Sequence, residues 1–412
     1  MSMERRFFFL VAVWGNTYVD NLLTFCLPTL LSPGNIPGLP NLSESQFTII
    51  TTQADEQEIR QSSLFATLSS LIRVEFILME ISHDNREEKY SHLGHAFKRA
   101  ASQALGKGQA FFVHPNAMYS EGMLTHLYRL SCQGRRVCVS HGPVVSKEKL
   151  IPYLSHRKLC QFDKVTAIQP RAMVKILMDN LHTDMSNHDV RNPFFPENPY
   201  MGLWRAPNGD GALFRFVSLH PYMVDLSRHD DIPDFTAIDH DFVRANGFVL
   251  SDIHIENDSD NFLVIGIKPE NEHNAHASQI ENDDVESAII NSTLIPSNCM
   301  YSIACFMNGI RVHSSDLDKT WHQFEEENFA YVNGLLVRGI ARGLDAYAHK
   351  TGRLPDSGAA QQQDKTASGQ LAAQYSLLKD GNKRGLTRIK TFVKHAVIAF
   401  FIRLGYRLVK IK

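Results

Sequence analysis

The sequence FFFLVAVWG, residues 7–15, decides the fold because it opens a series of short apolar runs, each closed by a turn signal. An unbroken apolar run of this length is typical of a strand buried on both faces, and Gly15 allows a tight turn after it. Apolar residues then recur at helical intervals over residues 18–31, until the sequence Ser-Pro-Gly at 32–34 ends the pattern. This segment predicts a strand, a turn and a helix. A buried strand also explains the apolar start better than an export signal, since no small-residue cleavage site follows it.

The same alternation continues along the first half of the chain. Further strands are expected at residues 47–51, 74–81, 110–113 and 137–140, and helices at 56–68, 90–105 and 123–132. Strands that alternate with helices of this length are the signature of a parallel sheet with crossover helices. We therefore expect an α/β fold with a Rossmann-like, mostly parallel sheet flanked by helices.

From about residue 165 the pattern changes to a mixture of helices and shorter β-like segments. A helix is expected at 171–181, β-like segments at 213–219, 249–255 and 262–267, a polar loop at 270–286 and further helix at 315–350. We divide the chain into a Rossmann-like half (1–165), a mixed α+β half of the same domain (166–350), a flexible linker rich in Gly, Ala, Ser and Gln (351–383) and a C-terminal segment (384–412).

Composition and missing motifs exclude several classes of protein. The chain has 42 Lys and Arg against 44 Asp and Glu, a net charge of -2, which makes no electrostatic case for nucleic acid. Six scattered cysteines without a C-x-x-C pair indicate free thiols in a reducing compartment. The dinucleotide fingerprint, the phosphate-binding loop and the G-x-S-x-G elbow are all absent, which argues against an NAD enzyme, a P-loop ATPase and an α/β-hydrolase.

The C-terminal segment has the pattern of a basic amphipathic helix. Basic residues flank an apolar stripe, and no acidic residue follows Asp380. The stripe recurs at steps of three or four residues: Leu386, Ile389, Val393, Val397, Phe400, Leu404, Leu408 and Ile411. Residues 384–412 are therefore expected to lie on an anionic membrane surface, with packing on the domain or on a partner as the alternative. No apolar stretch reaches the length of a spanning helix.

Several segments carry a resemblance to a known group of proteins. They are VAVWGNTYVD at 11–20, LPTLLSPGNIP at 27–37, TIITT at 48–52, HPNAMYSEG at 114–122, LHPYMV at 219–224 and TAIDHD at 236–241. Together they resemble bacterial glycosyltransferase-like proteins of the GT-A type over residues 7–268. The resemblance implies a nucleotide-sugar donor in the first half and a glycan or lipid-linked acceptor in the second. Its implied place is the cytoplasm, peripherally attached to the inner membrane.

The donor site is expected where parallel strands end. The candidates are Trp14, Gly15, Thr51, Thr52, Asn116, Ser120, Glu121 and Gly122. Trp14 suits stacking on a nucleobase or a place in the core, and Ser120 with Glu121 suits a ligand or a helix N-cap. GT-A enzymes usually carry an Asp-x-Asp motif here, which holds a divalent cation on the donor diphosphate. Asn116 stands in its place, which leaves a Mg²⁺ or Mn²⁺ requirement open and keeps alive a non-catalytic, membrane-attached sugar-binding or assembly protein.

The resemblance also suggests catalytic residues. Asp239 and Asp241 are two residues apart and would lie on the same side of an extended segment, so one of them is the expected general base, with His220 assisting; a turn with solvated carboxylates is the alternative. Weak candidates for metal ligands are Asn116, His220, Asp258 and Asp260, although turn chemistry alone explains the last two. A methyltransferase or another Rossmann-like transferase ranks last, because the Gly-rich first turn is missing.

Overall fold

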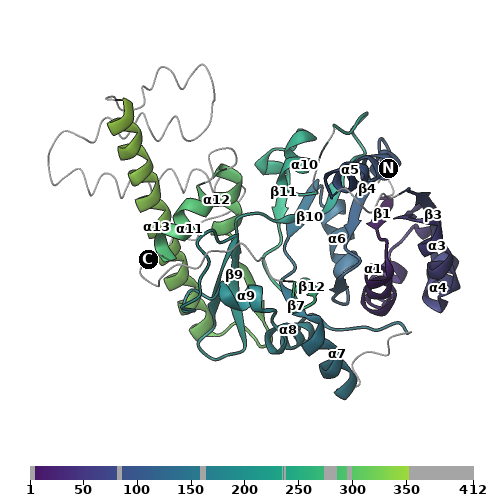
Figure 1. Ribbon diagram of the computed structural model, residues 1–412, viewed down its shortest axis with the longest axis horizontal. Helices are drawn as coiled ribbons and strands as arrows, with labels where there is room; N and C mark the ends of the chain where they lie inside the picture. Colours follow the sequence, from purple (N-terminus) through teal and green to yellow (C-terminus); the bar gives the residue numbers. More distant parts are fainter. Residues whose placement is uncertain are drawn as a thin grey trace.

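The computed structural model describes residues 5–80, 86–157, 164–233, 235, 238–272, 285–294 and 299–351. The predicted C-terminal helix over 384–412 and the linker from residue 352 onward lie outside the described residues, as does most of the predicted loop at 270–286. In Figure 1 the long helix α13 (Lys319–Thr351) lies at one end of the molecule, and α3 (Gln53–Gln61) and α4 (Ser63–Leu71) lie at the other.

A seven-stranded sheet forms the centre of the fold. Its strands, in spatial order, are β11 (Ile253–Ile255), β6 (Val137–Ser140), β10 (His220–Asp225), β4 (Gln109–Val113), β1 (Phe7–Ala12), β2 (Gln46–Thr51) and β3 (Arg73–Leu78). Strands β4, β1, β2 and β3 pair in parallel, as do β11 and β6, whereas β10 is antiparallel to both of its neighbours. The prediction of an α/β fold with a mostly parallel sheet is therefore confirmed.

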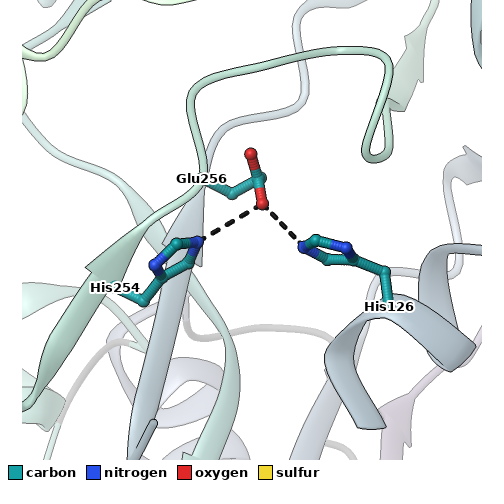
Figure 2. A group of neighbouring side chains, drawn as sticks. All are labelled: His126, His254 and Glu256. Atoms are coloured by element: carbon teal, nitrogen blue, oxygen red, sulfur yellow. Dashed lines mark hydrogen bonds and ion pairs between the residues drawn. The ribbon is translucent and has the colours of Figure 1, made fainter. Parts of the chain in front are cut away.

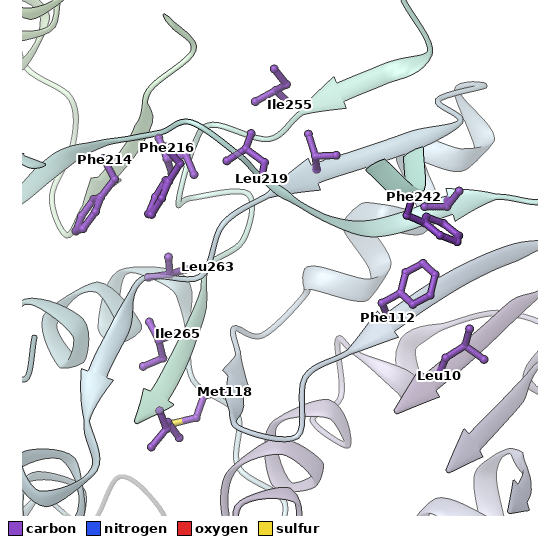
Figure 3. Packing of buried hydrophobic residues seen from close by; sticks show 14 of the residues in the cluster. Leu10, Phe112, Met118, Phe214, Phe216, Leu219, Phe242, Ile255, Leu263 and Ile265 are labelled. Carbon is purple, nitrogen blue, oxygen red and sulfur yellow. The ribbon is translucent and has the colours of Figure 1, made fainter. Parts of the chain in front are cut away.

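Strand β1 shows why the first run of the sequence builds a central strand. Phe8 and Leu10 face one side of the sheet and pack with the alanine-rich face of α5 (Arg86–Ser102). Phe7, Phe9 and Val11 face the other side, where the helices after β1 and α6 (Met123–Cys132) cover them. Each such side chain contributes roughly 1.5–3 kcal/mol when fully buried. Figure 3 shows the first cluster, in which Leu10 lies beside Phe112 and the Phe112 ring packs edge-on against Phe242.

Helices and short turns connect the strands of the first half. After β1 come α1 (Asn16–Asn21), a π-helical turn (Leu22–Cys26) and α2 (Leu27–Leu30), and short 3-10 turns (Ile36–Gly38, Leu42–Glu44) precede β2. The prediction of a single helix at 56–68 is wrong in one respect, because this segment forms two helices, α3 and α4. Ser62 separates them in an extended conformation, and its hydroxyl accepts a hydrogen bond from the Leu64 amide to cap α4.

The second half completes the central sheet and takes part in two small sheets, one of which also contains two strands of the first half. One sheet has the order β5 (Ala117–Tyr119), β12 (Val264–Lys268), β7 (Val144–Ser146), and the other has the order β13 (Ile310–His313), β9 (Gly211–Phe216), β8 (Met201–Arg205). The remaining helices are α7 (Lys147–His156), α8 (Pro170–Asp179), α9 (Thr183–Asn187), α10 (His240–Ala245), the 3-10 turn Leu250–Asp252, α11 (Val285–Thr293) and α12 (Cys299–Met307). Because β10 and β11 belong to the central sheet, that sheet crosses the predicted boundary at residue 165.

Two β-like segments differ from their predicted bounds. The run expected at 213–219 is interrupted: β9 ends at Phe216, and the next strand, β10, begins at His220. The run expected at 249–255 contains a 3-10 turn, and only its end forms β11. Within the described part of the chain, no helix combines the length and apolarity needed to cross a bilayer.

Candidate functional site

Three histidines meet at one edge of the central sheet. His114 follows β4, His141 follows β6, and His220 begins β10. Because β10 is antiparallel to both neighbours, its first residue lies at the edge where β4 and β6 end, and His220 pairs with Ser140 in the register. The ring centroids of His114 and His220 are 4.1 Å apart. The three imidazoles line a cavity of about 430 Å³.

Burial keeps these imidazoles uncharged near neutral pH. Desolvation lowers the pKa of His114 to about 4, and desolvation together with the nearby His114 ring lowers that of His141 to about 4. The pKa of His220 is lowered well below its usual value by desolvation and by both neighbouring rings. His141 also stacks on Phe216, with ring centroids 3.7 Å apart. The cavity therefore offers neutral groups that can donate or accept a hydrogen bond.

Two imidazole nitrogens in this group have no hydrogen-bond partner. Nδ1 of His220 donates to the carbonyl of Ile238 at 3.2 Å, which places the lone pair of the neutral ring on Nε2. That Nε2 atom and Nδ1 of His141 are both buried and unpaired. Buried polar atoms are normally satisfied, so unpaired ones beside a cavity indicate a place for a ligand or for ordered water.

A chain of hydrogen bonds sets the orientation of Asn116 at the same cavity. The ammonium of Lys147 donates to Oδ1 of Asn21 at 2.7 Å, and Nδ2 of Asn21 donates to Oδ1 of Asn116 at 3.1 Å. Because an ammonium can only donate, each amide oxygen must face its donor, and the chain fixes both amides. The backbone carbonyl of Asn116 also accepts a hydrogen bond from the Ile267 amide at 2.7 Å. Asn116 is left with its amide N–H groups to offer a ligand.

This donor set does not fit a Mg²⁺ or Mn²⁺ site. Hard cations prefer several converging carboxylate and carbonyl oxygens, whereas the side-chain oxygen of Asn116 is already engaged and the lining has three imidazoles and a single carboxylate, that of Glu272. The weak metal candidates Asn116 and His220 lie at one cavity, and His220 belongs to neither described group of three converging His, Cys, Asp or Glu side chains. The polar atoms suit the oxygens of a phosphate or a sugar better.

The turns after β1 and β2 are joined by a residue that the sequence analysis missed. The Asp55 carboxylate accepts from the Gly15 amide at 3.0 Å and from the Thr52 hydroxyl at 2.7 Å. Gly15 has φ +80°, which favours glycine, and Trp14 beside it is half-buried. Thr51 is fully buried. These predicted donor residues lie at the same edge of the sheet as the histidines but do not line the cavity.

Replacing Asp55 with alanine should loosen both turns together. The substitution leaves the Gly15 amide and the Thr52 hydroxyl without their acceptor; a hydrogen bond to a charged group contributes about 1.5–3 kcal/mol, and the exposed Gly15 amide can bond to water instead. We expect the free energy of unfolding to fall by about 2 kcal/mol in urea titrations. Glu58→Ala, an exposed change on the same helix, is the control and should stay within about 0.5 kcal/mol. Equal stability of the two variants would contradict this role.

Ser120, Glu121 and Gly122 lie between β5 and α6, and their bonds go to the protein itself. The buried Ser120 hydroxyl accepts from the Leu263 amide at 2.9 Å, and Glu121 Oε1 accepts from the Gly34 amide at 2.5 Å. The N-cap of α6 is Gly122, at φ +84°, so the alternative in which Ser120 caps this helix is wrong. The second carboxylate oxygen of Glu121 is buried without a partner.

Asp239 and Asp241 lie at the start of α10 rather than along an extended segment. Asp239 is the N-cap and accepts from the Asp241 amide at 2.8 Å. Asp241 is exposed and pairs with Arg244 at 2.7 Å. Neither lines the cavity, although Ile238, the residue before Asp239, accepts the hydrogen bond of His220.

Asp258 and Asp260 lie outside the cavity, in the turn between β11 and β12, and are paired with basic side chains. Asp258 contacts His313 at 3.0 Å and Arg311 at 3.1 Å, and Asp260 forms a two-pronged ion pair with Arg171. Asp258, Asp260 and His313 bring their ligand atoms within 4.8 Å of one another. Two arginines already neutralise the carboxylates, which is what the turn alternative anticipates.

Five polar residues at the cavity were not among the predicted site residues: His114, His141, Tyr222, Lys268 and Glu272. The first two fall at predicted strand ends, which is a usable signal, but a lone histidine there usually has a structural role. Lys268 ends β12 and pairs with Asp184 at 2.7 Å.

No known protein family matches this chain, and no characterised protein is detectably similar to it.

Proposed function

We propose that this protein is a glycosyltransferase of the GT-A type that binds a nucleotide-sugar donor at the carboxyl edge of its central sheet. The observation that carries the proposal is the cavity formed by residues that follow β4 and β6 and by the first residue of β10. Asn116 and three neutral imidazoles line it. In mostly parallel sheets, ligands bind at this edge, and a cavity with a few converging polar groups is the usual form of a small-molecule site.

The chemistry of the cavity suits a phosphate-linked sugar. Asn116 offers amide N–H groups, and the neutral rings of His114 and His141 each have one N–H group that can donate to a phosphate or sugar oxygen. The lining also has one charge of each sign, Glu272 and Lys268, and Lys268 pairs with Asp184. We propose that neutral hydrogen-bond donors replace the Asp-x-Asp motif, so that donor binding does not depend on Mg²⁺ or Mn²⁺.

His220 is the residue we propose as the general base. Its Nδ1 atom is held by the Ile238 carbonyl, and its buried Nε2 atom carries the lone pair. A base must carry a lone pair and reach the hydroxyl from which it takes the proton. His220 lines the cavity, whereas Asp239 caps a helix and Asp241 pairs with Arg244. The acceptor we propose is a hydroxyl of an envelope glycan or a lipid-linked sugar.

The test is thermal stabilisation by UDP-, GDP- and CMP-linked sugars, each with and without Mn²⁺. A ligand selective for the folded state stabilises it by about 2.7 kcal/mol at a hundred times its dissociation constant. We expect one nucleotide class to raise the Tm to the same extent with and without Mn²⁺, and Asn116→Ala to lose most of that shift.

Gln133→Ala is the matched control for this experiment. Gln133 is exposed and precedes β6, so it lies toward the opposite edge of the sheet from the cavity. This variant should keep the full shift. No shift with any donor in folded protein would overturn the proposal, and a shift that requires Mn²⁺ would overturn its metal-independent form. Binding without sugar transfer or donor hydrolysis would favour the non-catalytic sugar-binding protein.

A further inference from the structure

A second group of polar side chains lies away from the cavity, between α6 and the edge strand β11. His126 comes from α6, His254 from β11, and Glu256 directly follows that strand. Figure 2 shows both imidazoles directed at the same carboxylate oxygen from two sides. Nε2 of His126 lies 2.8 Å and Nε2 of His254 lies 3.3 Å from Oε2 of Glu256. The three ligand atoms are within 4.8 Å of one another.

The Glu256 carboxylate is held in place before any ion arrives. Its other oxygen, Oε1, accepts from the amides of Asn257 and Asp258 at 3.1 and 3.2 Å and from the Asn261 side chain at 2.9 Å. The Glu256 amide donates to the Val139 carbonyl of β6 at 2.9 Å. Hydrogen bonds of this kind orient metal-binding carboxylates and leave one oxygen for the ion.

The charge at this position also calls for a cation. Glu256 is only 3% exposed, and the basic groups paired with it among the described residues are these two imidazoles. A buried carboxylate is stabilised by a counter-charge close to it. A divalent ion supplies it while the rings act as neutral ligands.

We propose that His126, His254 and Glu256 form a zinc site with a fourth position open to solvent. Two imidazoles and one carboxylate are a common ligand set for Zn²⁺ in proteins, with a water molecule as the fourth ligand. The side chains of His126 and His254 are 13% and 27% exposed, so an ion can enter and a water molecule can reach it. The ion would join α6 to the edge strand of the sheet.

The neighbouring group of Asp258, Asp260 and His313 is a weaker candidate. Arg311 and Arg171 lie 3.1 and 2.7 Å from its two carboxylates, so arginine cations occupy the place that a metal ion would take. Glu256 has no such partner among the residues that the structure describes. This contrast makes the second group a useful comparison within the same chain.

The experiment measures zinc binding by the untagged, full-length protein after treatment with a chelator. We expect a single Zn²⁺ per chain in competition with a chromogenic chelator, four-coordinate d–d bands when Co²⁺ replaces it, and no such binding of Mg²⁺. His126→Gln and His254→Gln keep a side-chain N–H group for Glu256 but remove the ligand nitrogen. Each should weaken zinc binding by at least about 100-fold, the upper end of the loss seen for outer partners of metal ligands.

Two further variants decide where the ion binds. His322→Gln, an exposed change on α13, should bind zinc as the unaltered protein does. His313→Gln should do the same, and zinc loss in this variant alone would assign the ion to the Asp258 group and overturn the proposal. Failure of the unaltered protein to retain zinc or to give the Co²⁺ bands would overturn it without recourse to any variant.

Discussion

Acidification from pH 7 to pH 5 should destabilise this protein mainly through the three histidines at the cavity. His114 and His141 have pKa values lowered to about 4 in the folded state, and the pKa of His220 is also lowered well below its usual value, whereas unfolded histidine titrates near 6.5. Between pH 6.5 and 4 the unfolded chain therefore binds more protons than the folded chain. The histidines do not lower the free energy of unfolding above pH 6.5. As the pH drops from 6.5 toward 4, the free energy of unfolding falls by up to about 1.4 kcal/mol per histidine for each pH unit.

Urea denaturation at a series of pH values measures this effect as the slope of the free energy of unfolding against pH. His141→Phe preserves a ring against Phe216 and removes one titrating group, so the slope between pH 6.5 and 5 should fall by up to about 1.4 kcal/mol per pH unit. His156→Gln, at the exposed end of α7, is the control and should leave the slope largely unchanged. An unaltered slope in His141→Phe would show that the folded protein admits protons at the cavity, contrary to the buried, neutral group described above.

The same histidines show which parts of the fold and the site could be predicted from the sequence and which could not. The strands of the first half could be predicted because each is a continuous apolar run between turn residues, and β1, β2, β4 and β6 lie within a residue or two of their expected bounds. The cavity could not be predicted as a whole. It depends on β10 inserting between β4 and β6 in the antiparallel direction, and this pairing joins residues 80 to 116 positions apart.

The same holds for individual site residues: residues in local motifs could be proposed from the sequence, and contacts between distant elements could not. Asn116 and His220 stand in motif-like segments and could be proposed from the sequence, and both line the cavity. The orientation of the Asn116 amide could not, because Asn21 and Lys147 set it from distant elements. The spacing of Asp239 and Asp241 suggested a shared face of an extended segment. The local preference of aspartate for a helix N-cap prevailed instead.

The hydrogen bonds of Arg215 join three elements of the second half, and its replacement should destabilise the protein strongly. Arg215 lies on β9 and is 2% exposed. Nη1 donates to the carbonyls of Phe306 and Met307, both at 2.8 Å, and Nε donates to Oδ1 of Asn328 on α13 at 2.6 Å. The two carbonyls end α12, where a positive charge complements the helix dipole.

Arg215→Met keeps the apolar stem and removes every donor, so two helix-end carbonyls and the Asn328 amide lose their partner in a dry environment. Burial lowers the pKa of Arg215 to about 10, so the guanidinium is still charged at neutral pH and its loss is that of a charged donor. We expect the free energy of unfolding to fall by about 3–5 kcal/mol in urea titrations at pH 7. Arg191→Met, at a side chain that is 66% exposed, should cost less than about 1 kcal/mol. If the two variants were equally stable, the second half would depend on apolar packing alone, since apolar residues can replace buried charged groups without loss when the remaining partners find other bonds.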